Sequence, residues 1–412
     1  MCPVDYIHRR RDLRLGRFWK YPLCITLAAL ICSITVAQQK YNVNYDEQKV
    51  NPYTLPDPLK TSDGLLVKTK NQWESKRRPE ILKLFEDNVY GQMPTSYDSL
   101  SYTIINQNDN TLDGKAQLKE VDIKVFRNNQ SVIIHLVLFI PHSKPKPAVF
   151  LLINNRGPEN IDPTRKTKSD FWPAELVIDS GYAIAAFNVR DLAPDNKDSF
   201  AVEALRLYPE QLAANNGMRA IGAWAWGASR VMDYLEKDSD VDSRKVAVVG
   251  HSRGGKAALW AAAQDKRFAI CISNCSGNSG AKLSKRNFGE TVEIINTAFP
   301  HWFTTNYKKY NNNEAALPVD QHMLVSLIAP RPVYATSASK DLWADPTGTF
   351  LSLKNAERVY ALFGLKSALP AQPPAINQPF IKPPLAYHNR EGEHNLTVYD
   401  WKKFIVYGNT CF

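Results

Sequence analysis

The segment Gly250-His251-Ser252-Arg253-Gly254 has the Gly-x-Ser-x-Gly pattern that surrounds a nucleophilic serine in many hydrolases. An apolar run, residues 245–249, precedes it, and a run of small residues, 255–263, follows it. This order predicts a strand, a sharp turn and a helix, with glycines where side chains would collide with neighbouring backbone. The helix N-terminus also favours an anion beside the serine. We therefore predict that Ser252 is a nucleophile for acyl transfer rather than part of a plain strand–helix junction.

A serine hydroxyl needs a histidine to take its proton and a carboxylate to orient that histidine. On an α/β-hydrolase sheet the acid follows the serine along the chain, and the histidine comes last. Asp341 lies just after an expected strand, residues 332–337, whereas Asp345 is better explained as a cap of the turn that follows it. His394 lies in a polar loop after the last expected strand, and His388 lies within that strand or flush with it. We predict that Asp341 is the acid and His394 is the base.

Two backbone N–H groups are expected to stabilise the oxyanion of an acyl-transfer reaction. One belongs to Arg253, and the other to the segment Asn155-Arg156-Gly157 after the third strand. Losing one such donor typically costs about 3 to 4 kcal/mol of transition-state stabilisation. A bulky cation beside the nucleophile is unusual, so we predict that the Arg253 guanidinium acts on the same charge instead of being an ordinary surface group.

The remaining histidines predict no metal site, and no cofactor is implied. His251, His301 and His322 are expected to make structural hydrogen bonds. No pair of histidines has the spacing of metal ligands together with a third ligand, so a zinc mechanism is disfavoured.

Short apolar runs predict the sheet that positions these residues. Four of them have the character of buried parallel strands, which lack polar alternation because both faces are covered. Two earlier runs, joined by Arg127-Asn128-Asn129-Gln130, are expected to form an antiparallel hairpin. The expected strands are 121–126 and 131–140 for the hairpin, then 148–153, 183–187, 246–249 and 269–273, and finally 332–337 and 384–388.

Helical segments alternate with these strands. One is expected over 73–94, with Pro79 at a first helical position and Gly91 just past the end, and another over 218–235. The alternation predicts an α/β fold, namely an α/β-hydrolase: a doubly wound, three-layer sandwich with a mostly parallel sheet. Two long insertions, about 190–216 and 277–323, could roof the active site.

The N-terminus has the features of a secretory signal peptide. Basic residues from Arg9 to Lys20 precede an apolar run, 22–36, and small residues end at Ala37. The apolar run is shorter than the roughly 20 residues that a spanning helix needs, so cleavage after Ala37 is preferred to a retained membrane anchor. We predict three parts: a signal peptide at 1–37, an N-terminal tether or surface wrap at 38–63, and an α/β-hydrolase catalytic domain at 64–412.

Charge and cysteine content narrow the expected partners. Cleavage would remove six basic and two acidic side chains, so the net charge of +10 would fall to +6. No basic stripe is interleaved with aromatic residues, so nucleic acid is not an expected partner, whereas a modest positive field favours an anionic substrate. Three cysteines would remain, Cys271, Cys275 and Cys411, and an odd number of this kind does not indicate a disulfide framework.

Five segments form a pattern that is far more specific than the serine turn alone. They are Gly250-His251-Ser252-Arg253-Gly254-Gly255-Lys256, Arg286-Asn287-Phe288-Gly289-Glu290-Thr291, Ala298-Phe299-Pro300-His301-Trp302-Phe303, Leu317-Pro318-Val319-Asp320-Gln321-His322 and Asp341-Leu342-Trp343-Ala344-Asp345-Pro346. Together they resemble carbohydrate esterase family 15, the glucuronoyl esterases, in its bacterial branch. The similarity extends over most of the chain, from about Trp73 to Trp401.

The resemblance implies a role for each member of the catalytic set. Ser252 corresponds to the nucleophile, Arg253 to an oxyanion stabiliser and His394 to the base. Fungal members place their catalytic glutamate in a Glu-Ser-Gly segment, where this chain has Cys275-Ser276-Gly277. The acid of the bacterial alternative is present as Asp341, in agreement with the assignment made from chain order.

The resemblance also implies that Lys256, Glu290 and Trp343 contact the uronate sugar. Lys256 lies four residues after Ser252, hence one turn down on the same helix face, where its ammonium could reach a polar group of the sugar. The alternative for Lys256 is a lysine that covers the helix end. Trp343 could pack on a pyranose face or fill the core of its own loop.

These observations predict an esterase that acts on glucuronate or 4-O-methyl-glucuronate esters of glucuronoxylan, such as lignin–carbohydrate links, through an acyl-enzyme. One alternative is an acetyl xylan esterase of the same fold. Another is a catalytically inactive carbohydrate-binding relative, although the intact Ser, Asp and His set counts against it. We expect an exported protein, periplasmic or secreted, that is monomeric and not inserted in the membrane after signal cleavage.

Overall fold

The computed structural model describes residues 42–412. The predicted signal peptide, 1–37, and the start of the predicted tether lie outside the described residues. The chain divides into two units, Met1–Val43 and Asn44–Phe412, and the second contains the sheet and the helices of the described residues. Over 42–412, no helix combines the length and the apolar character needed to cross a bilayer.

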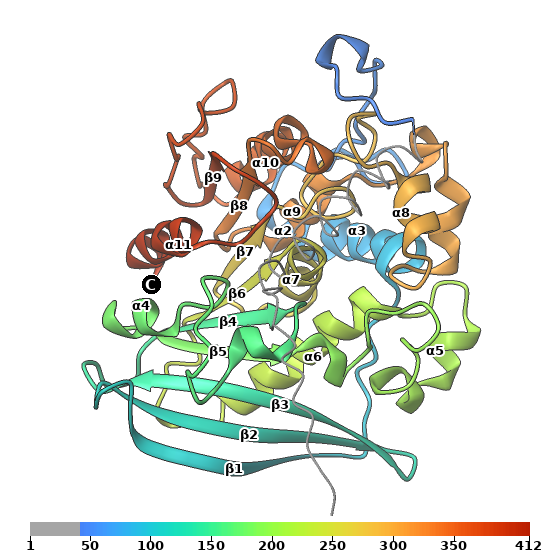
Figure 1. Ribbon diagram of the computed structural model, residues 1–412. Coiled ribbons are helices and arrows are strands. Elements are labelled where there is room, and N and C mark those ends of the chain that lie inside the picture. The colour runs from blue at the N-terminus through green and yellow to red at the C-terminus, as the bar shows by residue number, and fades with distance from the viewer. Residues whose placement is uncertain (1–41) are drawn as a thin grey trace, which may run out of the picture. The chain divides into compact units, whose positions relative to one another are not determined.

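A nine-stranded sheet runs through the second unit (Figure 1). Its strands are β1 (Ser99–Thr111), β2 (Ala116–Arg127), β3 (Gln130–Pro141), β4 (Val149–Asn154), β5 (Ala183–Asn188), β6 (Val246–His251), β7 (Ile270–Asn274), β8 (Val333–Ala338) and β9 (Leu385–Arg390). Their order is β1-β2-β3-β5-β4-β6-β7-β8-β9. Pairs from β1 to β3 and the β3–β5 pair are antiparallel, and all others are parallel. The six predicted strands of the parallel part are confirmed to within two residues at each end.

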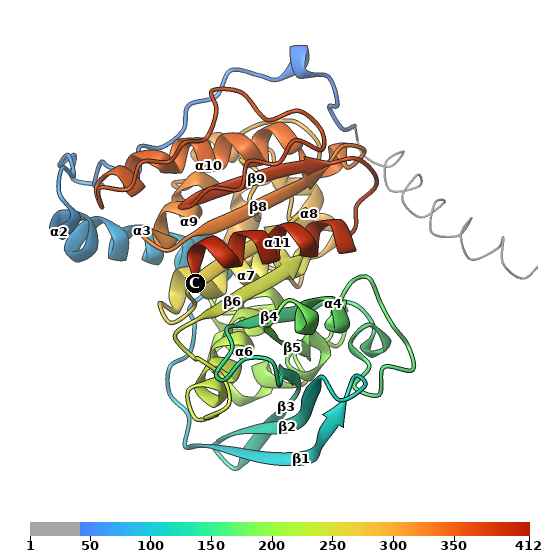
Figure 2. The same ribbon diagram turned by 90° about the vertical axis from the view of Figure 1, so that its left-hand side faces the viewer.

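Helices cover both faces of this sheet, as Figures 1 and 2 show. The helices on one face are α3 (Arg78–Phe85), α6 (Ala220–Leu235), α7 (Arg253–Gln264), α9 (Gln321–Ile328) and α10 (Pro346–Ala361), and those on the other are α4 (Ala174–Asp179) and α11 (Val398–Cys411). Shorter helices are α2 (Lys70–Gln72), α5 (Pro209–Ala213) and α8 (Val292–Ala298). The predicted doubly wound α/β-hydrolase fold is confirmed.

The alternation of side chains along β4 explains the two layers. Val149, Leu151 and Ile153 join the hydrophobic cluster under α6 and α7, whereas Phe150 and Leu152 join the cluster under α4 and α11. Successive side chains of a strand point to opposite faces, so a strand covered on both sides must be apolar throughout.

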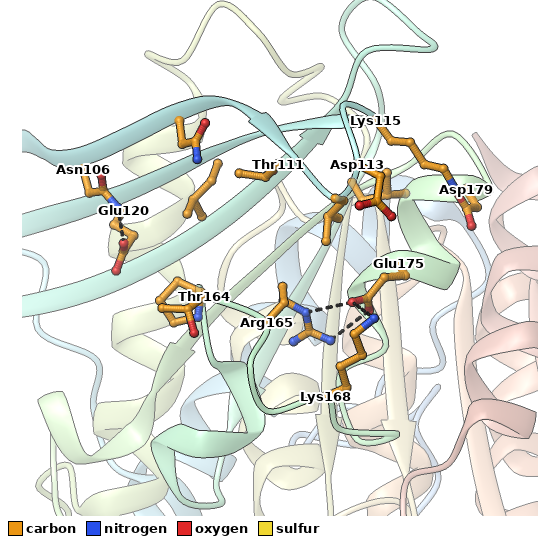
Figure 3. Close-up of a pocket in the computed structure, with 15 residues that line it drawn as sticks. Asn106, Thr111, Asp113, Lys115, Glu120, Thr164, Arg165, Lys168, Glu175 and Asp179 are labelled. Carbon is orange, nitrogen blue, oxygen red and sulfur yellow. Dashed lines mark hydrogen bonds and ion pairs between the residues drawn. The ribbon is translucent and has the colours of Figure 1, made fainter.

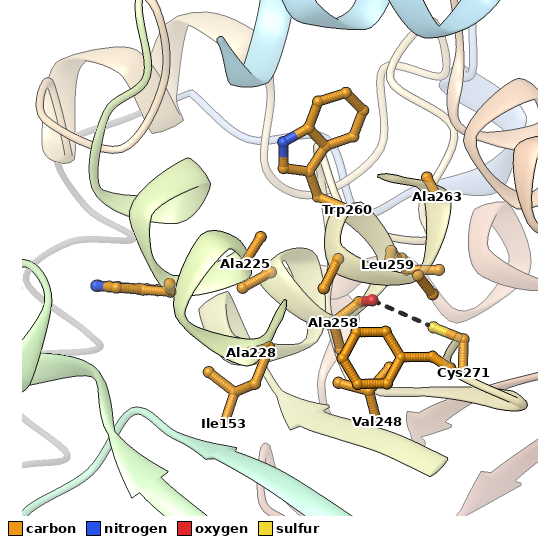
Figure 4. Close-up of a cluster of buried hydrophobic side chains, with 14 of the residues drawn as sticks. Ile153, Ala225, Ala228, Val248, Ala258, Leu259, Trp260, Ala263 and Cys271 are labelled. Carbon is orange, nitrogen blue, oxygen red and sulfur yellow. Dashed lines mark hydrogen bonds between the residues drawn. The ribbon is translucent and has the colours of Figure 1, made fainter. Parts of the chain in front are cut away.

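Small side chains let α6 and α7 lie close to the strands. Figure 4 shows Ala225 and Ala228 of α6 and Ala258 of α7 beside Ile153 of β4 and Val248 of β6, and all five side chains are fully buried. An interior packed to this density resists displacement of its helices. The N-terminus of α7, which follows the serine turn, is therefore held firmly against the sheet.

The edge of the sheet is partly as predicted. β2 and β3 form the expected hairpin, with Arg127 paired to Gln130 and with positive φ at Asn128 and Asn129, as a two-residue turn requires. β1 was not predicted; Leu100 and Tyr102 alternate with polar residues and pack against the core, but most of its 13 residues are exposed and its last six are polar.

The first helical segment begins earlier than predicted. The Thr69 side chain caps its start at Lys70, and Pro79 stands at a first position of α3, as predicted. A π-helical stretch, Trp73–Arg77, precedes the proline and widens the hydrogen-bonding pattern where a proline would otherwise disturb it. Gly91, with φ of 91°, ends the segment as expected.

Residues 44–63 extend over the catalytic unit. The Asn44 side chain donates to the Asn287 carbonyl at 2.9 Å, and the Gly289 N–H donates to the Asn44 carbonyl at 2.8 Å. These contacts attach the N-terminal segment to the loop that carries Glu290.

Candidate active site

Ser252 occupies a strained turn between β6 and α7. Its φ of 54° and ψ of −124° lie outside the regions that a serine ordinarily adopts, and its N–H donates to the Asn274 carbonyl at 2.8 Å. A Cβ atom at Gly250 would lie 2.0 Å from the Gly254 carbonyl oxygen, so no larger residue fits there. The side chain of Ser252 is partly exposed. This is the geometry predicted for a nucleophile turn.

Asp341 and His394 are brought together from segments 53 residues apart. Asp341 follows β8 and His394 follows β9, and because these strands are parallel neighbours their C-terminal ends meet at one edge of the sheet. His394 Nδ1 lies 2.5 Å from Asp341 Oδ2. The His394 ring, 38% exposed, lies 4.6 Å from the ring of His251, the residue before Ser252. The predicted acid and base thus lie beside the serine turn.

The alternative candidates have structural surroundings. His388 in β9 is fully buried, and its two ring nitrogens contact Tyr334 Oη at 2.7 Å and Asp400 Oδ1 at 2.9 Å. Asp345 caps α10 by accepting from the Gly348 N–H at 2.9 Å. His388 therefore has no ring nitrogen left for a substrate, and Asp345 is a helix cap as predicted.

A buried arginine shapes the loop that carries His394. The Arg390 guanidinium donates to the carbonyls of Glu393 and Asn395, at 2.8 and 2.7 Å, on either side of His394. Asp400 accepts from Arg390 Nε at 3.0 Å. Because both flanking carbonyls are held, the His394 side chain is presented from a fixed backbone.

The predicted oxyanion segment packs against the turn. The Asn155 side-chain oxygen lies 2.9 Å from where a Cβ of Gly254 would be. The N–H of Arg156 donates to the Asn154 side chain at 3.1 Å, so this N–H already has an acceptor within the protein. Arg253 is the first residue of α7, and its N–H has no carbonyl four residues earlier within the helix to bond.

The three predicted sugar-binding residues also lie together. Lys256 Nζ donates to the carbonyls of Ser276 and Asn278, both at 2.6 Å, and lies 3.6 Å from Glu290 Oε2. The Glu290 N–H donates to the Trp343 carbonyl at 2.9 Å, which joins the Glu290 loop to the loop of Asp341. Lys256 and Glu290 are buried, with 4% and 6% of their side chains exposed, and Trp343 is partly exposed.

Burial changes the proton affinity of Lys256. Desolvation lowers the pKa of Lys256 to about 8; the Glu290 carboxylate opposes this lowering, and the Arg253 charge adds to it. The ammonium therefore loses its proton at a lower pH than an exposed lysine does.

The insertions contribute a residue that the sequence did not mark. Asp195, from the 190–216 insertion, accepts a hydrogen bond from Trp302 Nε1 at 2.7 Å and forms an ion pair with Arg253. Its Oδ1 also lies 3.0 Å from His301 Nε2. Nothing in the local sequence separates Asp195 from other loop aspartates, because its partners are more than fifty residues away.

One group of side chains has the composition of a metal site. Ligand atoms of Cys275, Asp341 and His394 lie within 4.8 Å of one another. Two zinc ligands, each about 2.0 Å from the ion, would lie about 3.3 Å apart, whereas Asp341 and His394 are closed on each other at 2.5 Å. The group fits a hydrogen-bonded acid–base pair better than a metal cage. Cys275, like the other cysteines of residues 42–412, is free, and burial raises the pKa of its thiol well above the usual value.

A separate pocket of about 570 Å³ lies between the β1–β2 hairpin and the segment that leads into α4 (Figure 3). Its basic side chains are paired with acidic ones: Lys115 with Asp179, and Arg165 and Lys168 with Glu175. None of the predicted site residues lines this pocket, and we do not assign it to the active site.

Comparison with known proteins identifies the family. The model of the glucuronyl esterases of fungi matches residues 123–364. The carbohydrate esterase MZ0003 of an unknown prokaryotic organism is 38% identical over 94% of this chain and 97% of its own. The chain belongs to the glucuronoyl esterase family. A glucuronoyl esterase from Solibacter usitatus, of known structure, is 37% identical with a TM-score of 0.83, covering 89% of this chain and all of the other.

Fungal members are more distant from this glucuronoyl esterase. The 4-O-methyl-glucuronoyl methylesterase 1 of Wolfiporia cocos is 27% identical over 76% of this chain and 72% of its own.

A promiscuous CE15 esterase from a marine bacterial metagenome, of known structure, is 38% identical, with a TM-score of 0.84 over 90% of this chain and all of that one. The resemblance inferred from the five sequence segments is therefore confirmed.

Proposed function

We propose that this glucuronoyl esterase hydrolyses esters of glucuronic or 4-O-methyl-glucuronic acid with Ser252, His394 and Asp341 as its triad. The observation that carries the proposal is the 2.5 Å contact between Asp341 and His394 beside the strained turn of Ser252. Relatives named 4-O-methyl-glucuronoyl methylesterase support the substrate class.

Acylation begins at the C6 carbonyl of the uronate. Ser252 Oγ attacks the carbonyl carbon while His394 Nε2 takes its proton, and Asp341 holds the Nδ1 proton of the imidazolium that forms. Collapse of the tetrahedral intermediate breaks the bond to the alcohol, which leaves with the proton from His394. Water then attacks the acyl-enzyme with His394 as base, and the uronate departs. These steps use only side chains, backbone groups and water.

The oxyanion is stabilised by the Arg253 N–H, by a second donor from the 155–157 segment, and by the Arg253 guanidinium. Arg253 immediately follows Ser252 in the chain, and its guanidinium pairs with Asp195. Preorganised donors of this kind cost no reorganisation during the reaction, which is why they contribute strongly to catalysis.

The uronate is recognised by Lys256, Glu290 and Trp343. A sugar hydroxyl can accept from the Lys256 ammonium and donate to the Glu290 carboxylate, and the partly exposed Trp343 offers an apolar face to the ring. Since the acid loop and the Glu290 loop are hydrogen-bonded to each other, recognition of the sugar and alignment of the ester are coupled.

The natural substrate in this proposal is a glucuronoxylan ester to lignin alcohols. We further propose that residues 1–37 direct export to the periplasm or the medium, that residues 38–63 form a tether or surface wrap ahead of the catalytic domain of 64–412, and that the domain acts as a monomer. Mass spectrometry of the exported protein would locate the mature N-terminus.

A covalent intermediate provides the direct test of the mechanism. Trypsin releases Ser252 in the peptide of residues 246–253. Enzyme quenched during turnover of benzyl glucuronate should contain a glucuronoyl group on this peptide, and the Ser252→Ala variant should not. An adduct on another peptide, or turnover by Ser252→Ala, would contradict the assignment of the nucleophile.

A further inference from the structure

Asp195 lies at the centre of a polar cluster over the active site. Its Oδ2 accepts from Arg253 Nη1, and its Oδ1 accepts from Trp302 Nε1 at 2.7 Å and lies 3.0 Å from His301 Nε2. Both oxygens are thus engaged, and the side chain is 17% exposed. The cluster joins the 190–216 insertion, the 277–323 insertion and the residue after the nucleophile.

The Arg253 guanidinium depends on this cluster for its orientation. It lies over the rings of Trp302 and Phe299, at 5.0 and 5.5 Å from their centroids, and these rings stack on each other at 3.7 Å. Aromatic faces attract a cation but leave it free to rotate in their plane. Among residues 42–412, Asp195 is the only carboxylate that pairs with Arg253, so it supplies the directional contact.

The charge state of Asp195 fits this role. Burial by itself would raise the pKa of Asp195, but the hydrogen bonds from His301 and Trp302 and the Arg253 charge lower it to about 2. The carboxylate is therefore ionised wherever the esterase would work. Arg253 Nε is buried and has no hydrogen-bond partner among the described residues, so the guanidinium is hydrogen-bonded at one end only.

We propose that Asp195 is a positioning residue that orients the Arg253 guanidinium for the oxyanion of the esterase reaction. The inference rests on the proposed function, because it assigns Asp195 a role only through Arg253. The 190–216 insertion then belongs to the catalytic machinery and is more than a roof over it. Pairing of Asp195 with Arg253 reduces the net charge at the site. The guanidinium, however, holds its N–H donors in one plane, so fixing its orientation keeps an N–H directed at the oxyanion of the transition state.

A double-mutant cycle tests the proposal. Asp195→Ala should lower kcat on benzyl glucuronate by about 10- to 100-fold, the range expected for a hydrogen bond to a charged group, with little change in KM. Arg253→Ala should lower kcat at least as far. In the Arg253→Ala background, Asp195→Ala should cause almost no further loss, because residues that act as a unit are not additive.

Two further variants make the result decisive. Asp198→Ala changes an exposed aspartate of the same insertion, which pairs only with Lys197, and should leave kcat unchanged. Asp195→Asn keeps an acceptor for Trp302 and removes the charge, so it replaces Asp195→Ala in the test if that variant does not fold. In the Arg253→Ala background, Asp195→Asn should also cause almost no further loss of kcat. An equal loss from the Asp195 change with and without Arg253 would overturn the proposal, as would full activity of Asp195→Ala. Full activity of Arg253→Ala would instead contradict the role of Arg253 in the proposed function.

Discussion

The contact between Asp341 and His394 allows the most detailed prediction. In Asp341→Asn, the side chain keeps its size but loses the charge that favours the imidazolium. The amide nitrogen, when it faces His394 Nδ1 at the observed 2.5 Å, must donate, which places the imidazole proton on Nε2. The nitrogen that should accept the Ser252 proton is then already protonated.

The expected loss is large because this tautomer is inactive. The corresponding change in a serine protease lowers kcat by about 10⁴-fold, which is about 5 kcal/mol in activation free energy. Asp341 is 6% exposed, so water cannot readily replace the lost carboxylate. We expect kcat of Asp341→Asn on benzyl glucuronate to fall by about 10³- to 10⁴-fold at neutral pH, with KM little changed.

The measurement is steady-state kinetics together with thermal unfolding of each variant. Cys275→Ala is the matched control, since its thiol lies beside the same pair and burial keeps it protonated by raising its pKa. It should change kcat little. Retention of more than a tenth of the activity by Asp341→Asn, or an equally large loss from Cys275→Ala alone, would refute the assignment of the acid.

Three other predictions concern the base and the sugar site. Ser252→Ala and His394→Ala should each abolish nearly all turnover without unfolding the protein, and an active His394→Ala with an inactive His388→Ala would reverse the assignment of the base. Trp343→Ala should reduce kcat/KM for methyl, allyl and benzyl glucuronate by similar factors, about tenfold, and should reduce aryl acetate hydrolysis much less; equal losses on both would assign Trp343 to support of the catalytic loop. Since the pKa of Lys256 is lowered to about 8, its ammonium is present below that pH and lost above it. KM for benzyl glucuronate should therefore rise above about pH 8 while KM for aryl acetate stays flat, and parallel profiles would contradict a contact between Lys256 and the sugar.

Features set by neighbouring residues were predictable from sequence. The Gly-x-Ser-x-Gly turn, the two-residue hairpin at Asn128-Asn129 and the apolar parallel strands each depend on local chemistry, and the structure has all three. β1 was missed because its alternation is limited to residues 99–104, and pairing with β2 stabilises the polar remainder. The helical segment starts at Lys70 rather than at Trp73, because Thr69 caps it there, whereas Pro79 stands at a first position of α3 as predicted.

The same distinction between local and long-range effects holds for the residues of the active site. Chain order alone pointed to Asp341 and His394, since the C-terminal ends of parallel strands must meet. Asp195 could not be found in this way, because its role depends on Arg253 and Trp302, which reach it only after both insertions have folded. The near-complete burial of Lys256 was also unexpected, because its two carbonyl partners lie beyond the end of β7.

Selection of a uronate ester by this site can be tested by comparing two substrates. The wild-type kcat/KM is measured on benzyl glucuronate and on an acetylated xylan oligomer under identical conditions. We predict that the glucuronate ester is hydrolysed with the far higher kcat/KM, and that Ser252→Ala loses this activity. Faster release of acetate from the xylan oligomer would contradict it and would favour an acetyl xylan esterase on the same fold.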